Sequence, residues 1–415
     1  MTRAMPSTIA VLDVGTSKLC CFIARGDDGG EIHIEGIGHH VSAGIKAGTV
    51  TDMAAAESAI RHVVHQAEAM ASRTIEDVMV VTTAGDLASA LLTVEVSVAG
   101  HAVARADIDR VLRLAGRQVA RELRAVLHAQ PACYSVDGAF GVRDPEGMFG
   151  ERLGVDFHMV TAEAGPLQNL ETCIQRCHLN VAGFIAAPYA AGLATLHEEE
   201  KDLGVACIDM GGGVTSIAIF CGGQLVDCAV LPLGGAAITR DIAKLLSTPL
   251  AEAERLKTLY GTVLECAADH REVVEVTPLA EPSSPASGGR IRKSQLTGLI
   301  RPRVEETLEL AADKLRAAGF LGRETGTVVL TGGASSLSGI NHLAEEILRC
   351  PVRFGFPLGP MGLAEATSGP AFAAGVGALL HAAQPASVED YVGTHGQDHG
   401  RPWPERIVQW LREAL

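Results

Sequence analysis

The sequence predicts an α/β fold in which one structural plan occurs twice. A strand, an Asp, a tight glycine-containing turn and a second strand follow one another at residues 8–25 and again at 208–220. Asp13 and Asp209 hold equivalent places in these two copies. A third segment, 328–340, reads as a buried strand, a glycine pair and then a helix. Hairpins alternating with helices and further strands are typical of layered α/β proteins.

The turn of the second copy carries the strongest chemical signal. Successive glycines have no Cβ, so a phosphate group can approach their backbone N–H groups. The carboxylate of Asp209, at the end of the preceding strand, is an oxygen ligand of the kind that Mg²⁺ prefers. The turn consists of Gly211, Gly212 and Gly213, with the hydroxyl of Thr215 shortly beyond it. The alternative for this stretch alone is a hairpin with a glycine-rich turn.

The first copy is shorter and adds a cation. After Asp13 and Gly15 come the hydroxyls of Thr16 and Ser17, which can donate hydrogen bonds, and then Lys18, whose charge suits a phosphate. Taken alone, Lys18 could be an exposed lysine of a hairpin. The repeated layout favours a pair of phosphate-binding turns.

Composition excludes several classes of protein. The 415 residues are 47% hydrophobic, which excludes global disorder, and the net charge of −15 disfavours a nucleic-acid binder. The sequence has no apolar run long enough to span a membrane and no signal peptide. Its 10 cysteines mostly stand in apolar runs, as reduced cytoplasmic thiols do. Cys173, Cys177 and His178 could suggest a metal site, but no second ligand pair accompanies them, so we interpret the two cysteines as buried residues of a helix.

The elements of the first half follow in order. Alternating residues predict a strand at 31–38, and a helix begins at Thr51-Asp52 and runs to about residue 70. A small inserted unit is predicted at 87–165, with its own strands and a helix at 106–120. A helix at 165–176, a strand at 180–185 and a small-residue helix at 186–196 come next. The charged run 198–202 is expected to be solvated.

The second half restarts the plan. Glycines at 234–235 lead into a helix, and a further helix at 249–257 places Glu254 and Lys257 at i, i+3 spacing, where surface pairing is the plain explanation. Residues 277–289 are rich in Pro, Ser and Gly and predict a flexible loop. The pair Gly332 and Gly333, with Ala334 and Ser335, is expected to form a surface for a base and ribose. A closing helix of small residues is predicted at 371–380.

These three segments, in this order, resemble the two phosphate motifs and the adenosine motif of the actin/Hsp70/hexokinase superfamily. Within it, the runs 203–213, 248–261 and 330–340 resemble the FtsA family of bacterial cell-division actin homologues. The resemblance implies duplicated ribonuclease-H-like domains with an inserted 1C subdomain. It divides the chain into 1A (1–86), 1C (87–165), a return to 1A (166–203), 2A (204–235), 2B (236–325), and 2A with the closing helix (326–380).

The resemblance also implies ATP and Mg²⁺ as ligands. Asp13 and Asp209 would orient the metal, and the two glycine turns with their hydroxyls and Lys18 would hold the phosphates. Glu254, Lys257, Gly332, Gly333, Ala334 and Ser335 would border the ribose and adenine. The chain departs from the family at Ser216, where many members have Asp, and near Ala187, where no Gln or Glu stands to orient a water. ATP binding with weak or absent hydrolysis is the expectation.

The C-terminal end is a separate unit. Residues 381–402 are predicted to be a flexible linker, and 403–415 an amphipathic helix that begins near Pro404. The apolar face contains Trp403, Ile407, Trp410, Leu411 and Ala414, with Val408 and Leu415 on its flank, and so includes both tryptophans of the chain. Tryptophan favours the headgroup region of a bilayer, so the helix is expected to be an interfacial membrane anchor. The alternative is a terminal helix that packs back on the core.

The predicted function is therefore an ATP-binding cell-division protein that polymerises and tethers FtsZ filaments to the cytoplasmic face of the inner membrane at the septum. The resemblance places the site for the FtsZ tail peptide in 2B and the sites for other division proteins in 1C. Two alternatives remain at this point: a pilus-assembly actin homologue, or a small-molecule kinase of the same superfamily. No nucleic-acid partner is expected.

Overall fold

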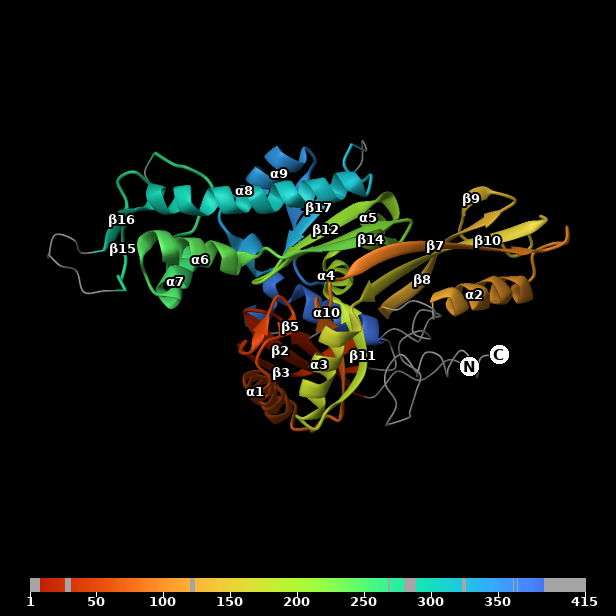
Figure 1. The fold of residues 1–415 in the computed structure, drawn as a ribbon, viewed down its shortest axis with the longest axis horizontal. Coiled ribbons are helices and arrows are strands. Elements are labelled where there is room, and N and C mark those ends of the chain that lie inside the picture. Colours follow the sequence, from red (N-terminus) through yellow and green to blue (C-terminus); the bar gives the residue numbers. More distant parts are fainter. Residues whose placement is uncertain are drawn as a thin grey trace.

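The computed structural model describes residues 8–26, 31–119, 124–267, 269–279, 289–322, 326–360, 362–363 and 365–383. The predicted membrane helix 403–415 and nearly all of the predicted linker 381–402 lie outside these residues, as do residues 280–288 of the predicted loop. Within the described ranges, two five-stranded sheets form the two halves of the molecule (Figure 1).

The first sheet has the order β11-β6-β1-β2-β3. β1 and β2 form the predicted antiparallel hairpin around Gly15, and β6 and β11 continue the sheet in parallel. The helix α1 begins after Asp52, whose carboxylate accepts a hydrogen bond from the N–H of Ala55, and packs on β2 and β3. The bounds are β1 Ile9–Val14, β2 Lys18–Gly26, β3 Ile32–Val41, β4 Ile45–Lys46, β5 Thr49–Val50, α1 Met53–Ala71, β6 Asp77–Thr82, α3 Ala164–Gln175, β11 Asn180–Ala186, α4 Ala187–Thr195 and α5 Glu198–Leu203.

The second sheet, β14-β13-β12-β17-β18, repeats this topology. β12 and β13 form an antiparallel hairpin around the triple glycine, and β17 and β18 extend the sheet in parallel. The duplicated plan is therefore confirmed strand by strand. The bounds are β12 Val205–Met210, β13 Thr215–Cys221, β14 Gln224–Leu231, β17 Thr327–Thr331, the 3₁₀ helix η2 Gly333–Ser336, α9 Ile340–Leu348, β18 Val352–Phe354, the 3₁₀ helices η3 Glu365–Thr367 and η4 Pro370–Phe372, and α10 Ala373–Ala383.

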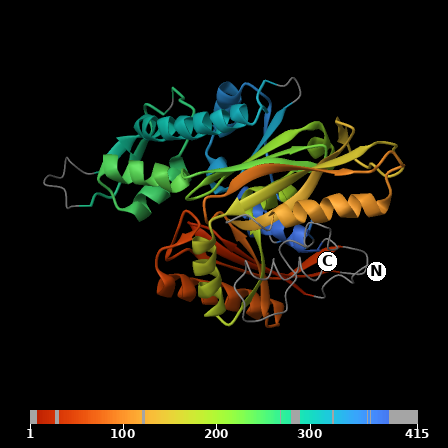
Figure 2. The same cartoon turned by 45° about the vertical axis from the view of Figure 1, so that its right-hand side comes forward.

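The inserted unit is a separate sheet with its own core. Its described strands have the order β7-β10-β8-β9, and α2 packs on β7 and β10 (Figures 1 and 2). Val111 and Phe157 are among the side chains buried in this core. The bounds are β7 Ala88–Ser97, α2 Arg105–Val119, β8 Ala125–Val136, β9 Ala139–Val142 and β10 Arg152–Ala162.

A helical region extends from the second half at the opposite end of the molecule from the insert (Figure 1). The long helix α8 packs against α6 and α9, and the short hairpin β15–β16 lies beside it. The bounds are α6 Gly235–Leu246, α7 Leu250–Tyr260, β15 Val273–Glu275, β16 Arg290–Arg292 and α8 Lys293–Ala317.

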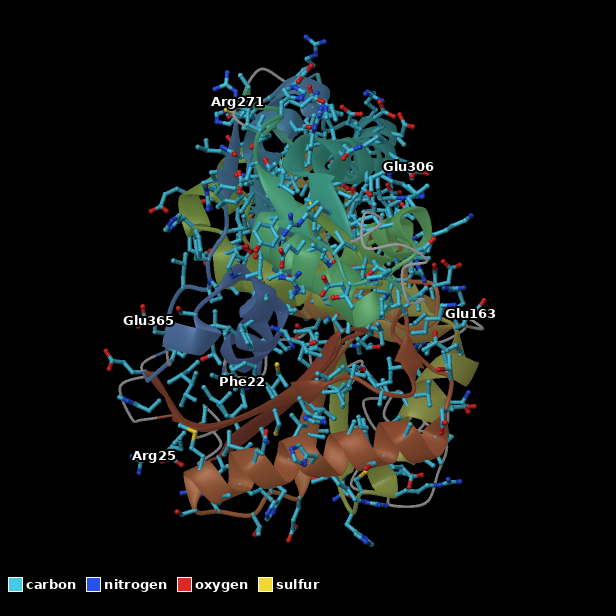
Figure 3. All side chains as sticks on the ribbon, turned by 90° about the vertical axis from the view of Figure 1, so that its left-hand side faces the viewer. Phe22, Arg25, Glu163, Arg271, Glu306 and Glu365 are labelled. Carbon is cyan, nitrogen blue, oxygen red and sulfur yellow. The ribbon has the colours of Figure 1, made fainter. Side chains whose placement is uncertain are left out.

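Each half has its own hydrophobic core, with the small-residue helices α4 and α10 packed on each other at the junction. Gly377 permits this approach, since a Cβ there would overlap the carbonyl oxygen of Ala190. Seen from the side, the two halves lie one above the other, and Phe22 of β2 lies below the blue C-terminal segment (Figure 3). Among the residues described here, no helix is both long and apolar enough to cross a membrane.

Two expectations need correction. The charged run 198–202 is not simply solvated, because it forms α5 and buries Lys201, whose ammonium group pairs with Glu198 at 2.6 Å. Glu200 accepts a hydrogen bond from Nε of Arg353 at 2.7 Å, which ties α5 to β18. The predicted linker also begins too early, since α10 continues through Ala383.

Candidate functional site

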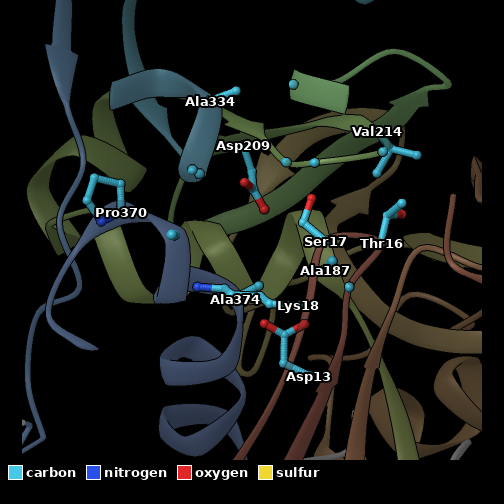
Figure 4. A pocket seen from close by; sticks show the side chains of 18 of the residues that line it. Asp13, Thr16, Ser17, Lys18, Ala187, Asp209, Val214, Ala334, Pro370 and Ala374 are labelled. Atoms are coloured by element: carbon cyan, nitrogen blue, oxygen red, sulfur yellow. The ribbon is translucent and has the colours of Figure 1, made fainter. Parts of the chain in front are cut away.

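A cleft of about 290 Å³ opens between the two halves, at the ends of the duplicated hairpins. Both copies of the plan and the third glycine segment contribute to its walls (Figure 4). The predicted residues that line it are Asp13, Gly15, Thr16, Ser17, Lys18, Asp209, Gly211, Gly212, Gly213, Glu254, Lys257, Gly332, Gly333 and Ala334. The structure thus brings together segments that are more than 300 residues apart in the chain.

Asp13 and Asp209 point into the cleft from opposite sides (Figure 4). Each lies near the end of a central strand, β1 or β12. Burial raises the pKa of Asp13 to about 6 and that of Asp209 to about 7, where the charge of Asp13 adds to the effect. Two half-buried carboxylates that ionise with difficulty suit a divalent cation, which would stabilise their charged form. The residues present therefore fit Mg²⁺.

The two turns contact each other across the cleft. A Cβ on Gly212 would overlap the Ser17 hydroxyl, and one on Gly213 would overlap the side chain of Thr16. Because these glycines have no side chains, the two turns can come into contact. The same absence leaves room for a phosphate to approach the backbone N–H groups. Each turn is closed by one backbone hydrogen bond, from Gly15 to the carbonyl of Lys18 at 3.2 Å and from Gly211 to that of Val214 at 2.9 Å.

Lys18 supplies a positive charge to the cleft from the turn of the first hairpin. Burial lowers the pKa of its ammonium group, although the acidic groups of Cys20, Asp13 and Asp209 act in the opposite direction. Its Nζ lies 3.1 Å from the centroid of the Phe372 ring, in a cation–π contact. Lys18 is therefore held at the edge of the cleft by an aromatic face.

The third segment forms the opposite wall. Gly332 has φ of +86°, and a Cβ there would overlap the Asp209 carboxylate, so this position requires glycine. Its N–H donates to the carbonyl of Pro370 at 3.2 Å. From the helix α7, Glu254 and Lys257 pair at 2.6 Å, and Lys257 also donates to the carbonyl of Gly235 at 3.2 Å. These groups offer both a carboxylate acceptor and an ammonium donor at the cleft mouth.

Two predicted residues do not line the cleft. Thr215 is fully buried and donates from Oγ1 to the carbonyl of Leu233 at 2.8 Å. Ser335 is also fully buried and donates to the carbonyl of Gly332 at 2.7 Å, while Ser336 lines the cleft in its place. Both hydroxyls support the turns from behind. Sequence alone did not distinguish them from lining residues because the direction of a side chain after a turn depends on the turn itself.

Several lining residues were not predicted from the sequence. Thr82, Thr83 and Thr258 bring hydroxyl groups, and Pro370 and Ala371 belong to η4. The end of β6 is the available signal for the threonine pair, because parallel strands present their carboxyl ends at one edge of a sheet. Ala187 also lines the cleft, at the start of α4.

The cysteine and histidine cluster lies at the end of α3. Cys173 is a helix residue as expected, but Cys177 and His178 lie in the turn that follows the helix, so the expectation of a helix is wrong for Cys177. The thiol of Cys173 is directed to the carbonyl of Met53 at 3.8 Å, and that of Cys177 to the carbonyl of Glu57 at 3.5 Å. In the part of the chain that the structure describes, no group of three or more His, Cys, Asp or Glu side chains could hold a metal ion. His158 is buried in the insert, and the half-buried His128 accepts a hydrogen bond from the N–H of Ala186 at 2.8 Å, where the insert meets the first half.

Comparison with known proteins supports these features. A family model described as cell division protein FtsA matches residues 206–377, and one described as the SHS2 domain inserted in FTSA matches residues 84–161. The cell division protein FtsA of Rhizobium meliloti (strain 1021) is 41% identical over 98% of this chain and 95% of its own length. That of Escherichia coli (strain K12) is 30% identical over the full length of both.

Solved structures share the fold at low identity. The PilM-PilN type IV pilus biogenesis complex matches with a TM-score of 0.62 and 18% identity over 91% of this chain and 99% of that chain. MreB5 of Spiroplasma citri bound to ADP matches with a TM-score of 0.51 and 14% identity, over 90% of this chain and 95% of that one. The actin-like fold is confirmed, and the identity to the curated relatives shows that the chain belongs to the family of the cell division protein FtsA.

Proposed function

We propose that this chain binds ATP with Mg²⁺ in the cleft between its two halves. The observation that carries this proposal is the meeting of two half-buried carboxylates, Asp13 and Asp209, with two glycine turns and Lys18 in one cavity. Asp13 and Asp209 would hold Mg²⁺, directly or through water, and the metal would neutralise charge on the phosphates. The turn N–H groups and Lys18 would hold the phosphates, and Glu254, Lys257, Gly332 and Gly333 would border the nucleoside. A fold neighbour crystallised with ADP is consistent with this ligand.

ATP would act mainly as a ligand that favours the conformation competent to polymerise. The first half supplies Asp13 and Lys18 and the second half Asp209, so a bound nucleotide bridges both halves and favours the relative position in which it binds more tightly. Ala187 brings no group that could orient an attacking water. We therefore propose slow hydrolysis and a long-lived ATP-bound state.

Titration calorimetry with Mg·ATP tests the nucleotide site. Asp209→Asn should weaken binding at least tenfold, because it removes a charge that faces the metal. Asp227→Asn, on the second sheet but not among the residues of the cleft wall, is the matched control and should bind as the wild type does. Phosphorylation of small hydroxy or carboxy acceptors by the wild type would instead favour the kinase alternative.

We further propose that the chain polymerises and tethers FtsZ filaments to the cytoplasmic face of the inner membrane at the septum. The family membership supports a role in division, and a fold neighbour that forms a double helical filament, MamK, is consistent with a self-polymer. The FtsZ tail peptide would bind 2B, and other division proteins 1C. The helix 403–415 would be the membrane anchor. A single such helix binds weakly, so polymerisation would strengthen attachment through avidity.

Co-sedimentation with vesicles of phosphatidylethanolamine and phosphatidylglycerol tests the anchor. The full chain should pellet with vesicles, more strongly with ATP, and a Trp403→Glu/Trp410→Glu variant should stay in the supernatant. Fluorescence anisotropy with a labelled FtsZ C-terminal peptide tests the partner, with a pilus-protein N-terminal peptide as the control. Binding of the pilus peptide alone would favour the pilus-assembly alternative.

A further inference from the structure

A row of large apolar side chains is exposed at the edge of the second sheet. Phe354 ends β18, the edge strand, and Phe356 and Leu358 follow at alternate positions. Their exposed fractions are 36%, 54% and 39%. We call residues 354–358 the apolar row. Contiguous exposed apolar groups of this kind mark interaction sites more often than isolated ones do.

The backbone explains why these side chains face outward. Gly355 lies between the two phenylalanines, and a Cβ there would meet Val329 and Thr195 of the core. Neighbouring residues in an extended segment point to opposite sides, so Phe354 and Phe356 are directed away from the core. Two backbone hydrogen bonds fix the segment, from Gly355 to the carbonyl of Leu330 and from Leu358 to that of Ala194, both at 2.7 Å.

The row lies beside the helix from which the tail continues. A Cβ on Gly359 would lie 3.2 Å from a terminal carbon of Leu380, so the end of the row contacts α10 in its last turns. α10 ends at Ala383. The chain therefore leaves the described structure within about one helical turn of this contact.

The tail has the length and the side chains to cover the row. Residues 384–402 are mostly polar and include several Gly and His residues, and the sequence predicts a linker here; a chain of this length with random-coil statistics spans about 25 Å on average. Such a tether gives an effective concentration in the millimolar range, so even weak docking is populated. Segment 403–415 then offers two tryptophans, Ile407 and Leu411 on one predicted face.

We propose that segment 403–415 docks on the apolar row when no membrane is present. The regulatory consequence rests on the proposed function of this segment as the membrane anchor. The same apolar face cannot contact the row and a bilayer at once, so the two compete. The docked population lowers the apparent affinity for membrane in proportion to the fraction of tails that are free. The row thus keeps the anchor covered until a membrane displaces it.

The tryptophan emission of the full chain measures docking directly, because both tryptophans of the protein stand in this segment. Without lipid, we expect a blue-shifted emission maximum and weak acrylamide quenching relative to a synthetic 403–415 peptide. Phe354→Ser and Phe356→Ser should each lower the docking constant about tenfold, as loss of a central aromatic contact does. Their emission should move toward that of the peptide. Phe140→Ser and Phe149→Ser, exposed positions on the insert, are the controls and should change nothing.

The outcomes separate this inference from the anchor itself. Full acrylamide quenching of the wild type, or a Phe356→Ser emission equal to that of the wild type, overturns docking. A blue shift that disappears on dilution overturns it in favour of a second copy of the chain on the row.

Vesicle binding is measured on the same proteins, and docking predicts tighter vesicle binding by Phe356→Ser. If the wild-type chain shows the blue-shifted emission without lipid but does not bind vesicles, the membrane anchor is overturned and docking is left intact. Leu358→Ser repeats the test at a third position of the row.

Discussion

The ammonium nitrogen of Lys18 lies 3.1 Å from the centroid of the Phe372 ring. Phe372 ends η4 and contacts Phe22 edge to face, with ring centroids 6.5 Å apart. The carbonyl of Pro370, in the same short helix, accepts the N–H of Gly332. The η4 segment therefore contacts both the lysine of the first turn and the glycine of the third segment, which stand on opposite walls of the cleft.

The contact predicts that Phe372 supports phosphate binding through Lys18. Phe372→Leu keeps an apolar side chain but removes the aromatic face, and a desolvated cation–π contact is worth about 0.5–2 kcal/mol. We expect the affinity for Mg·ATP to fall about 2- to 30-fold in titration calorimetry. Phe372→Tyr retains the face and should bind as the wild type does. Equal affinity of the Leu variant and the wild type would show that the ring does not position the lysine.

The contact between the two turns leads to a second prediction. Gly212→Ala introduces a Cβ that overlaps the Ser17 hydroxyl, so the turns must separate. Mispositioned turn N–H groups should weaken Mg·ATP binding more than tenfold, while overpacking at one site costs about 1–3 kcal/mol of stability. Thermal unfolding with and without Mg·ATP measures both effects, because a bound ligand raises the midpoint.

Gly165→Ala is the control for that experiment. Gly165 lies in the first turn of α3, and a Cβ there would meet no atom within 4 Å. The substitution should stabilise the chain slightly and leave the ligand-dependent rise unchanged. A full ligand-dependent rise in Gly212→Ala would contradict a role for this glycine in the site.

The sequence predicted those residues of the site whose place follows from the order of strands and glycine turns along the chain. Asp13 and Asp209 each stand next to a glycine turn after an apolar strand. This repeated order, together with the family resemblance, predicted that both carboxylates belong to one site. Thr215 and Ser335 have the same local pattern, but their hydroxyls bond to carbonyls behind the turns. The order of residues along the chain does not indicate whether such a hydroxyl faces the cleft or a carbonyl behind the turn. Phe372 was missed for a related reason, because its role depends on the packing of η4 against a strand 350 residues earlier.

The fold likewise contains features that local sequence predicts and features that depend on residues far apart in the chain. Alternation and glycine turns predicted the duplicated hairpins, whereas the charged run 198–202 was interpreted from composition alone. One of its residues, Glu200, is held by Arg353 in β18, from the far end of the chain. Long-range ion pairs of this kind leave no local signal.

The buried histidine of the insert predicts acid sensitivity. Burial lowers the pKa of His158 to about 4 from its usual 6.5, and its Nε2 lies 2.6 Å from the Ser89 hydroxyl. A lowered folded-state pKa means that the neutral form is the stable one. The full stabilisation is therefore present above pH 6.5 and is lost as the pH falls from 6.5 to 4. The difference of about 2.5 pKa units corresponds to about 3 kcal/mol.

Urea unfolding at pH 7.5 and pH 4.5, compared between the wild type and His158→Gln, checks this prediction. Gln keeps a hydrogen-bonding group opposite Ser89 but does not titrate, so the variant should lose less stability on acidification. His178→Gln is the control, since this residue lies after α3 in the first half, away from the insert, and should follow the wild type. Parallel pH dependence in all three proteins would assign the acid sensitivity to other groups.

Ala187 predicts how the slow ATP hydrolysis proposed above could be accelerated. It lines the cleft at the start of α4 and carries no group that could hold a water in line with a phosphate. Ala187→Gln places an amide there, and we expect the single-turnover rate of ATP hydrolysis to rise about tenfold or more at saturating Mg·ATP. Ala187→Leu adds similar bulk without the amide and should not raise the rate. If the rate rises equally in both variants, the effect comes from bulk at the start of α4. An unchanged rate in the Gln variant, with normal ATP affinity, would mean that slow hydrolysis has its cause elsewhere in the cleft.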